Sequence, residues 1–263
     1  MIIDKKNNNI SKIIKNIPLV NEKIENINGW FLKQDICLFD FFLLLQNIFN
    51  VNGNLLEIGI WEGKSLFKIL NYCKNNETLF GLDVKLKLST LKSHYSNFDN
   101  TDRLALIEDS SDNIIKHSEI NNIRFCHIDG CHRGDIVYND IVNVNHYSND
   151  FTILILDDFA KDYIGVMQAY YKAYFLNKTN FVPLLFSNRK CYFCHKKQYL
   201  AYYNYIKNNL FNFIINNYKN NCDIRTVVED TNTNINNMLY VLEYPQVEDD
   251  NYLINKKHIL GSY

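Results

Sequence analysis

From residue 53 onward, short apolar runs alternate with longer amphipathic stretches. Five runs have the length of single strands and lie at about 54–58, 78–83, 104–108, 123–128 and 151–156. Helical patterns lie between and after them, at about 64–73, 86–95, 111–118, 135–146 and 164–176. This rhythm is typical of βαβ units, in which helices connect parallel strands of one sheet. We therefore expect an α/β fold with a mostly parallel central sheet and helices on both faces.

The segments on either side of this region have different patterns. Residues 1–52 are expected to form an N-terminal helical cap, with its strongest helix at 35–49. Residues 53–197 form the central domain, in which 184–186 and 190–195 predict an antiparallel edge hairpin and bring the sheet to seven strands. Residues 198–263 form a C-terminal helix and extension. The longest apolar stretch, residues 36–49, is too short to span a bilayer, so we expect no membrane span.

Charge and cysteine usage exclude several classes of protein. The chain has 28 Lys and Arg against 29 Asp and Glu, so it lacks the basic excess of a nucleic-acid-binding protein. The first residues do not follow the signal-peptide pattern, and the seven cysteines are an odd number. Both features favour a reducing, cytoplasmic location over export.

The first candidate site is a turn that follows the first expected strand. It contains Glu57, Gly59 and Gly63 in the pattern Glu-x-Gly-x-x-x-Gly, and Ser65 begins the next helix. Glycines let a backbone approach a ligand closely. The pattern departs from the dinucleotide and phosphate-loop fingerprints, so an acidic residue here suits a ligand with a cationic amino group. An ordinary strand-to-helix turn is the alternative.

Two further acidic positions follow the next strands. Asp83 ends the second strand, where a carboxylate is placed to accept the hydroxyls of a ribose. Asp109 and Ser110 follow the third strand and are candidates to contact an adenine edge. For these two residues, helix N-capping is nearly as good an explanation, because Asp and Ser are preferred caps.

Three carboxylates follow two neighbouring buried strands. Asp129 ends one apolar run, and Asp157 and Asp158 end the next. Carboxyl ends of parallel strands meet at one edge of a sheet, so these groups should converge there. Carboxylates that close repel one another unless a cation lies between them or they take up protons. Oxygen ligands favour Mg²⁺ or Mn²⁺ over zinc, and capping of helices is the weaker alternative.

With these motifs in place, the sequence resembles the class I S-adenosylmethionine-dependent methyltransferases with a Rossmann-like fold. Within them it is similar to the metal-dependent sugar O-methyltransferases of the macrocin and mycinamicin type. The resemblance covers about residues 53–195. It implies that Glu57, Gly59 and Gly63 hold the methionine part of S-adenosylmethionine and that Asp83 holds its ribose. It also implies that Asp129, Asp157 and Asp158 carry the metal.

The resemblance has one departure, at the general base. Many sugar enzymes have a second Asp after Asp-Gly, whereas this chain has Cys131 followed by His132. Histidine titrates near the working range, so His132 is the preferred base and Asp129 its partner at the catalytic centre; a structural role for His132 is the alternative. The implied mechanism is direct methyl transfer to one of two neighbouring hydroxyls chelated by the metal.

The resemblance also implies an acceptor and an assembly. The expected acceptor is a sugar, plausibly nucleotide-activated, used in the biosynthesis of capsular or other surface polysaccharide. The alternatives are a phenolic or phosphate-like acceptor, or a non-catalytic cofactor-binding partner subunit. A nucleic-acid substrate is disfavoured by the near-neutral charge. Relatives often assemble through N-terminal helices, so residues 36–49 are a candidate homo-oligomer contact or a roof over the site.

Overall fold

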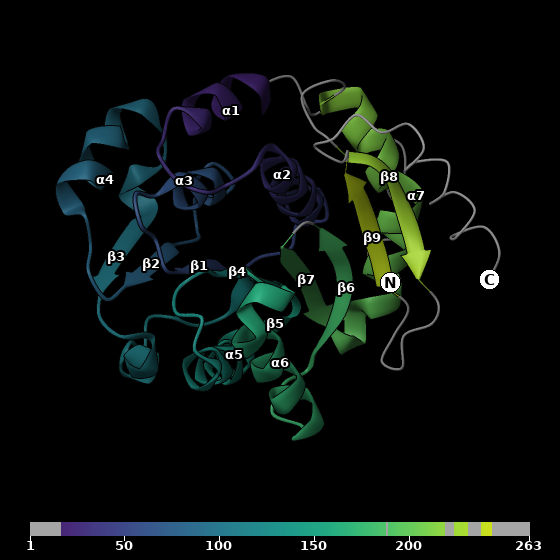
Figure 1. Cartoon of the computed structure of the whole chain (residues 1–263). Coiled ribbons are helices and arrows are strands. Elements are labelled where there is room, and N and C mark those ends of the chain that lie inside the picture. Colours follow the sequence, from purple (N-terminus) through teal and green to yellow (C-terminus); the bar gives the residue numbers. More distant parts are fainter. Residues whose placement is uncertain (1–16, 188, 219–223, 231–237, 244–263) are drawn as a thin grey trace.

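The computed structural model describes residues 17–187, 189–218, 224–230 and 238–243 (Figure 1). The helices are α1 (Ile17–Glu25), α2 (Lys33–Ile48), α3 (Lys64–Leu70), α4 (Leu88–His94), α5 (Gly134–Tyr147), α6 (Ile164–Phe175) and α7 (Tyr199–Tyr218). The strands are β1 (Asn54–Ile58), β2 (Leu79–Asp83), β3 (Leu104–Glu108), β4 (Ile123–Ile128), β5 (Ser148–Leu156), β6 (Phe181–Ser187), β7 (Lys190–His195), β8 (Ile224–Asp230) and β9 (Met238–Glu243).

The strands form one sheet in the order β3-β2-β1-β4-β5-β7-β6-β9-β8. Strands β1 to β5 are parallel, and β7 runs antiparallel between β5 and β6. The mostly parallel sheet is thus confirmed: its seven predicted strands are β1 to β7, and β8 and β9 bring it to nine. The hairpin of β6 and β7 is not at the edge, however, because β9 pairs in parallel with β6 and β8 pairs with β9. The polar tail around β8 and β9 concealed this extension in the sequence.

The sequence located most elements closely. Strands β1, β3, β4 and β7 begin and end at the predicted residues, whereas β5 begins three residues earlier than predicted, at Ser148. The predicted helix at 111–118 is instead the short 3-10 helix η5 (Ser111–Lys116). Residues 1–16 of the predicted N-terminal cap lie outside the described part of the chain.

Helices cover both faces of the sheet, as predicted, and each face has its own core (Figure 1). Alternate strand residues point to opposite faces: Leu55 packs with α2, α3 and α7, while Leu56 packs with α5 and α6. The first core runs continuously from α2 across the sheet to α7. The division into cap, central domain and C-terminal extension stays a prediction.

Helix α2 is buried in the chain's own core. Its apolar side chains, including Ile36 and Phe42, are fully covered by the sheet, α3 and α7. These side chains are therefore not available to a second subunit, and only the start of α2 faces the functional cavity described below. Over the described residues, no helix is both long and apolar enough to cross a membrane.

A buried charge network attaches α2 to its neighbours. Asp40 of α2 forms an ion pair with Lys68 of α3, and neither side chain is exposed. Asp40 also accepts hydrogen bonds from the hydroxyls of Tyr72 and Tyr218, and Asn21 accepts a 2.6 Å bond from Lys68. Breaking a buried pair by removing one partner typically costs about 3–5 kcal/mol. The network therefore connects α1, α2, α3 and the end of α7.

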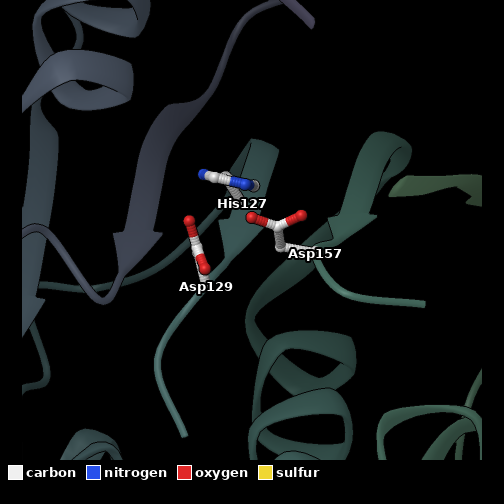
Figure 2. A group of neighbouring side chains, drawn as sticks. All are labelled: His127, Asp129 and Asp157. Carbon is white, nitrogen blue, oxygen red and sulfur yellow. The ribbon is translucent and has the colours of Figure 1, made fainter. Parts of the chain in front are cut away.

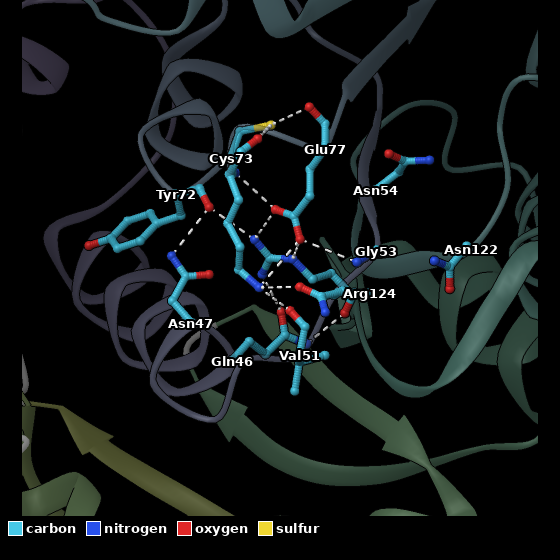
Figure 3. Close-up of polar contacts among 12 residues, drawn as sticks. Gln46, Asn47, Val51, Gly53, Asn54, Tyr72, Cys73, Glu77, Asn122 and Arg124 are labelled. Carbon is cyan, nitrogen blue, oxygen red and sulfur yellow. Dashed lines mark hydrogen bonds and ion pairs between the residues drawn. The ribbon is translucent and has the colours of Figure 1, made fainter.

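A second buried network holds the C-terminal end of α2 (Figure 3). Arg124 of β4 donates two hydrogen bonds to Glu77, at 2.9 and 2.8 Å, and one of 2.8 Å to Gln46 near the end of α2. Gln46 donates back to the Arg124 carbonyl at 2.7 Å. Glu77 also accepts a bond from the Gly53 backbone before β1. Helix α2 is thus fixed against the amino-terminal end of β4.

Asp140 provides a test of the packing of α5. Its carboxyl group is buried, and burial raises its pKa to about 6. An aspartate in an unfolded chain has a pKa of about 3.9, so the native state loses stability as pH rises through 6. We expect Asp140→Asn to be more stable than the wild type by roughly 1–3 kcal/mol above pH 7. The difference should shrink toward pH 4, as measured by urea unfolding.

The matched control for this test is Asp99→Asn, which changes an exposed carboxylate. It should leave the free energy of unfolding within about 0.5 kcal/mol of the wild type at both pH values. If Asp140→Asn increases the free energy of unfolding by the same amount at all pH values, the raised pKa of Asp140 is contradicted.

Candidate active site

The predicted glycine turn connects β1 to α3 and approaches β4 closely. Gly59 and Gly63 have positive φ angles of 86° and 91°. A Cβ on Gly59 would lie 2.2 Å from the carbonyl oxygen of Asp129, so only glycine fits there. Trp61, between the two glycines, also has a positive φ, of 52°. The turn thus brings its backbone directly against the end of β4.

Asp83 fixes the shape of this turn. Its Oδ2 accepts hydrogen bonds from the backbone N–H groups of Ile60 at 2.8 Å and Trp61 at 3.3 Å. Its Oδ1 accepts one from Lys85 at 3.0 Å. The structure therefore gives Asp83 a positioning role, and its contact with a ribose stays a prediction.

Asp109 and Ser110 organise the start of η5. The Ser110 hydroxyl accepts a hydrogen bond from the N–H of Asp112, which is the capping role considered from the sequence. Asp109 accepts bonds from Asn113 and from Ser110 N–H and contacts His117 at 3.0 Å. These partners, led by Asn113 and His117, lower the pKa of Asp109 to about 2. A contact of either residue with adenine stays a prediction.

The ends of β4 and β5 bring two predicted carboxylates together with a histidine (Figure 2). His127, Asp129 and Asp157 each offer a ligand atom within 4.8 Å of the others. The ammonium group of Lys190, from the start of β7, lies 2.5 Å from Asp157 Oδ2 and 3.4 Å from His127 Nε2. Lys190 is only 2% exposed. The site is therefore a buried cluster that contains two carboxyl groups, a histidine and an ammonium group.

The two carboxyl groups have opposite pKa shifts. Burial, followed by the negative charge of Asp157, raises the pKa of Asp129 well above its usual range. Burial would also raise the pKa of Asp157, but Lys190 and His127 override it and hold that pKa below its usual range. The two carboxyl groups therefore titrate as a coupled pair, in which Asp157 is the more readily ionised partner.

Glu57 lies behind this cluster. Its side chain is fully buried, and its Oε1 contacts His127 Nδ1 at 2.7 Å. Its second oxygen, Oε2, has no hydrogen-bond partner among the described residues. Glu57 therefore fixes the orientation of the His127 ring. A contact of Glu57 with the methionine part of the cofactor stays a prediction.

Asp158 has other partners than Asp129 and Asp157. It has a positive φ of 50°, and its two oxygens contact Arg189 Nε at 2.6 Å and His132 Nε2 at 2.9 Å. The His132 ring lies 4.3 Å from that of Tyr163, measured between centroids. The structure thus pairs Asp158 with the predicted base, and a metal-ligand role for Asp158 stays a prediction.

A cavity of about 650 Å³ connects these groups. Of the residues predicted from the sequence, it is lined by Gly59, Ser65, Asp129, His132, Asp157 and Asp158. Glu57, Gly63, Asp83, Asp109, Ser110 and the alternative base Cys131 are not among the lining residues. The cavity thus unites the glycine turn with the carboxylates and His132.

Several residues of the carboxylate cluster and the cavity were missed from the sequence. His127 precedes Asp129 by two residues on a strand, so the alternation of side chains was a usable signal for it. Lys190 and Arg189 lie in the β6–β7 hairpin, which offered no chemical motif. Trp30, before α2, lines the cavity because the cap folds over the glycine turn, a long-range contact that no local pattern indicates.

The comparisons with known proteins agree with this geometry. Residues 56–159 match a protein-family model described as a methyltransferase domain. This part of the chain is therefore similar to a methyltransferase domain. The match begins in β1 and ends just after Asp158, so it includes the glycine turn and all three predicted carboxylates. No curated protein matches the chain in sequence.

Solved structures with a similar fold support the predicted architecture. The O-methyltransferase NovP superimposes with a TM-score of 0.54 at 12% identity, over 62% of this chain and 79% of NovP. An O-methyltransferase from Bacillus cereus in complex with S-adenosylhomocysteine gives 0.52 at 15%, over 67% and 90%. The S-adenosylhomocysteine-bound Podospora anserina PaMTH1 gives 0.51 at 14%, over 68% and 88%. At 12–15% identity these likenesses confirm the predicted Rossmann-like fold.

The close approach of Gly59 to β4 predicts the effect of one methyl group. Gly59→Ala should displace the turn, destabilise the protein by about 2–4 kcal/mol and weaken S-adenosylhomocysteine binding at least tenfold. Thermal unfolding and calorimetric titration measure both effects. Gly130→Ala is the matched control, because its Cβ would meet no atom nearer than 3.5 Å. Equal binding by Gly59→Ala and the wild type would refute the assignment of the turn.

Proposed function

We propose that the protein transfers a methyl group from S-adenosylmethionine to a hydroxyl of a sugar, with Mg²⁺ or Mn²⁺ at the carboxylate cluster. The observation that carries this proposal is the shared cavity, where Asp129 and Asp157 lie beside the glycine turn. Asp129 and Gly59 are in direct backbone contact, so the cofactor and the acceptor would meet at one point. Holding two reactants in line is the main contribution that a protein makes to such a transfer.

The glycine turn suits S-adenosylmethionine. Gly59 and the backbone of Ile60 line the cavity, and Ser65 lines it from the start of α3. Asp83 stabilises the turn from behind through two backbone N–H groups. Preorganised backbone of this kind lets a ligand approach without rearrangement of the chain.

The cluster also fits a divalent cation. The carboxyl groups of Asp129, Asp157 and Glu57 outnumber the ammonium group of Lys190. Burial, and after it the negative charge of Asp157, raises the pKa of Asp129. An added cation would relieve this repulsion. Asp129 and Asp157 would hold it, with His127 as a further donor. When bound, such an ion supplies positive charge that lowers the pKa of an acceptor hydroxyl.

His132 is the proposed general base. Asp158 contacts His132 Nε2, which favours the tautomer with its proton there and leaves Nδ1 as the basic nitrogen. Tyr163 packs against the ring and limits its rotation. In the transfer, Nδ1 takes the hydroxyl proton, the acceptor oxygen bonds to the methyl carbon, and the sulfur keeps the electrons of the broken bond. The products are the methyl ether and S-adenosylhomocysteine.

The cavity mouth supports a sugar acceptor. Trp30 and Trp61 line it and are 87% and 52% exposed, with ring centroids 6.3 Å apart. Lys87 lies over the Trp61 ring at 3.3 Å, and Arg189 faces the ring of Tyr163 across the mouth. Flat aromatic surfaces with polar neighbours suit a sugar ring. The cations suit the phosphates of a nucleotide-activated sugar.

The proposal extends to the setting of the enzyme. A nucleotide-sugar of surface polysaccharide synthesis is the acceptor that we propose, and the cytoplasm is the proposed location. All six cysteines in the described part of the chain are free thiols, which suits a reducing compartment. A phenolic acceptor is the second candidate, since the same aromatic mouth accepts a planar ring.

The metal part of the proposal has a direct test. Purified protein treated with a chelator should lose methyl transfer to a panel of nucleotide-sugars, and Mg²⁺ or Mn²⁺ should restore it. Asp157→Asn should lower kcat by a factor of about 100 or more, because it removes a charge from the reacting centre. Binding of S-adenosylhomocysteine should change by less than about threefold, since Asp157 lies outside the glycine turn.

The matched control is Asp150→Asn, which changes a carboxylate at the opposite end of β5, where Asp150 pairs with Lys197. It should leave kcat unchanged. Full activity of the chelator-treated wild type would contradict the metal requirement. Absence of S-adenosylhomocysteine binding would contradict the cofactor assignment.

Tryptophan fluorescence tests the acceptor site, because Trp30 and Trp61 are the two tryptophans of the chain. An acceptor that covers the exposed ring of Trp30 should shift and quench the emission when S-adenosylhomocysteine is already bound. Trp30→Phe and Trp61→Phe assign the change to one ring. Trp30→Ala should raise the acceptor KM by roughly tenfold with little effect on cofactor binding. If an acceptor that the enzyme methylates binds without changing the emission, the assignment of the acceptor site to Trp30 is wrong.

A further inference from the structure

Lys190 is a buried cation that the proposed transfer does not use. It begins β7 next to β5, and its side chain lines the cavity. The ammonium group contacts Asp157 Oδ2 at 2.5 Å and His127 Nε2 at 3.4 Å and lies 5.9 Å from the ring centroid of Phe31. The charged groups that face it come from α2, β4 and β5, namely Asp35, Asp129 and Asp157.

Another buried lysine of the chain shows what a purely structural ion pair looks like. Lys68 also pairs with a buried aspartate, Asp40, but its partners belong to α1 and α2 and it does not line the cavity. Lys190 instead makes its ion pair inside the cavity, at a carboxylate that is a candidate metal ligand. Its ammonium group therefore lies where an incoming cation would find its ligand.

Two cations cannot use one carboxylate oxygen equally. Like charges within about 5 Å repel strongly in a partly buried site, where the effective dielectric constant is near 20. A divalent ion at Asp129 and Asp157 must therefore share Asp157 with Lys190 or displace it. Until then, Lys190 offsets the charge of Asp157 and keeps the carboxylates together.

We propose that Lys190 is a resident cation of the carboxylate cluster, which competes with the divalent ion for Asp157 and so sets the metal affinity of the site. This inference rests on the proposed function, since it concerns the same cluster. It makes Lys190 a positioning residue, acting through Asp157. It also distinguishes the site from a carboxylate cluster without a lysine, which would bind the same ion more tightly.

The test is a titration with Mn²⁺, in which electron paramagnetic resonance measures the free ion in the presence of S-adenosylhomocysteine. Lys190→Met removes the charge and should tighten Mn²⁺ binding about tenfold or more. Lys190→Arg keeps the charge and should stay within about threefold of the wild type. Lys64→Met removes a different cavity lysine, which bonds to the Gly29 carbonyl, and should leave the affinity unchanged.

A second variant protects the test against misfolding. Lys190→Gln keeps a hydrogen-bond donor for Asp157 without the charge, and it should tighten Mn²⁺ binding as well. Thermal unfolding and calorimetric S-adenosylhomocysteine binding identify the variants that are folded. Tighter binding by either folded, uncharged variant supports the proposal. Unchanged, weaker or absent Mn²⁺ binding in the folded variants overturns it and leaves Lys190 as a structural support of Asp157.

This outcome is separable from the fate of the proposed function. Methyl transfer by the chelator-treated wild type would show that the reaction needs no metal. The Mn²⁺ affinity of the variants would still decide whether Lys190 competes with a divalent ion for Asp157. Conversely, the wild type could require a metal while Lys190→Met and Lys190→Gln bind Mn²⁺ more weakly. That result would support the proposed function and contradict the competition between Lys190 and the metal.

Discussion

The contact between the glycine turn and the end of β4 determines the rest of the site. Gly59 lies against the Asp129 carbonyl, and its N–H bonds to Leu82 of β2 at 2.8 Å. The Asp129 N–H bonds in turn to Ile58 at 2.8 Å. Three neighbouring strands are therefore joined by backbone bonds at the point where chemistry is proposed. Backbone contacts tolerate side-chain exchange, so the distance between turn and carboxylates is fixed by the fold itself.

Charge compensation is the second constraint on the site. Both carboxylates that follow β5 are matched by cationic groups or a histidine: Asp157 by Lys190, and Asp158 by Arg189 and His132. Both cations come from the same hairpin, between β6 and β7. The insertion of the antiparallel strand β7 next to β5 therefore has an electrostatic purpose as well as a structural one.

The sequence predicted the sheet well because its strands are apolar runs with sharp polar ends, as in β1, β3 and β4. It also predicted that Asp129 and Asp157 meet, since this follows from the edge of a parallel sheet. It could not predict the partners of Asp158, because a positive φ and two long-range contacts decide where that side chain points. The position of Lys190 likewise depends on strand order, which local patterns do not encode.

Helix α2 is held in its middle by Asp40 with Lys68, and near its C-terminal end by Gln46 with Arg124 (Figure 3). A helix anchored in this way does not move as a lid, so the wall that Asp35 contributes to the cavity is stationary. Entry and exit of reactants must then depend on the short segment before α2, where Trp30 stands exposed. The rate of product release would accordingly be a property of residues 26–32.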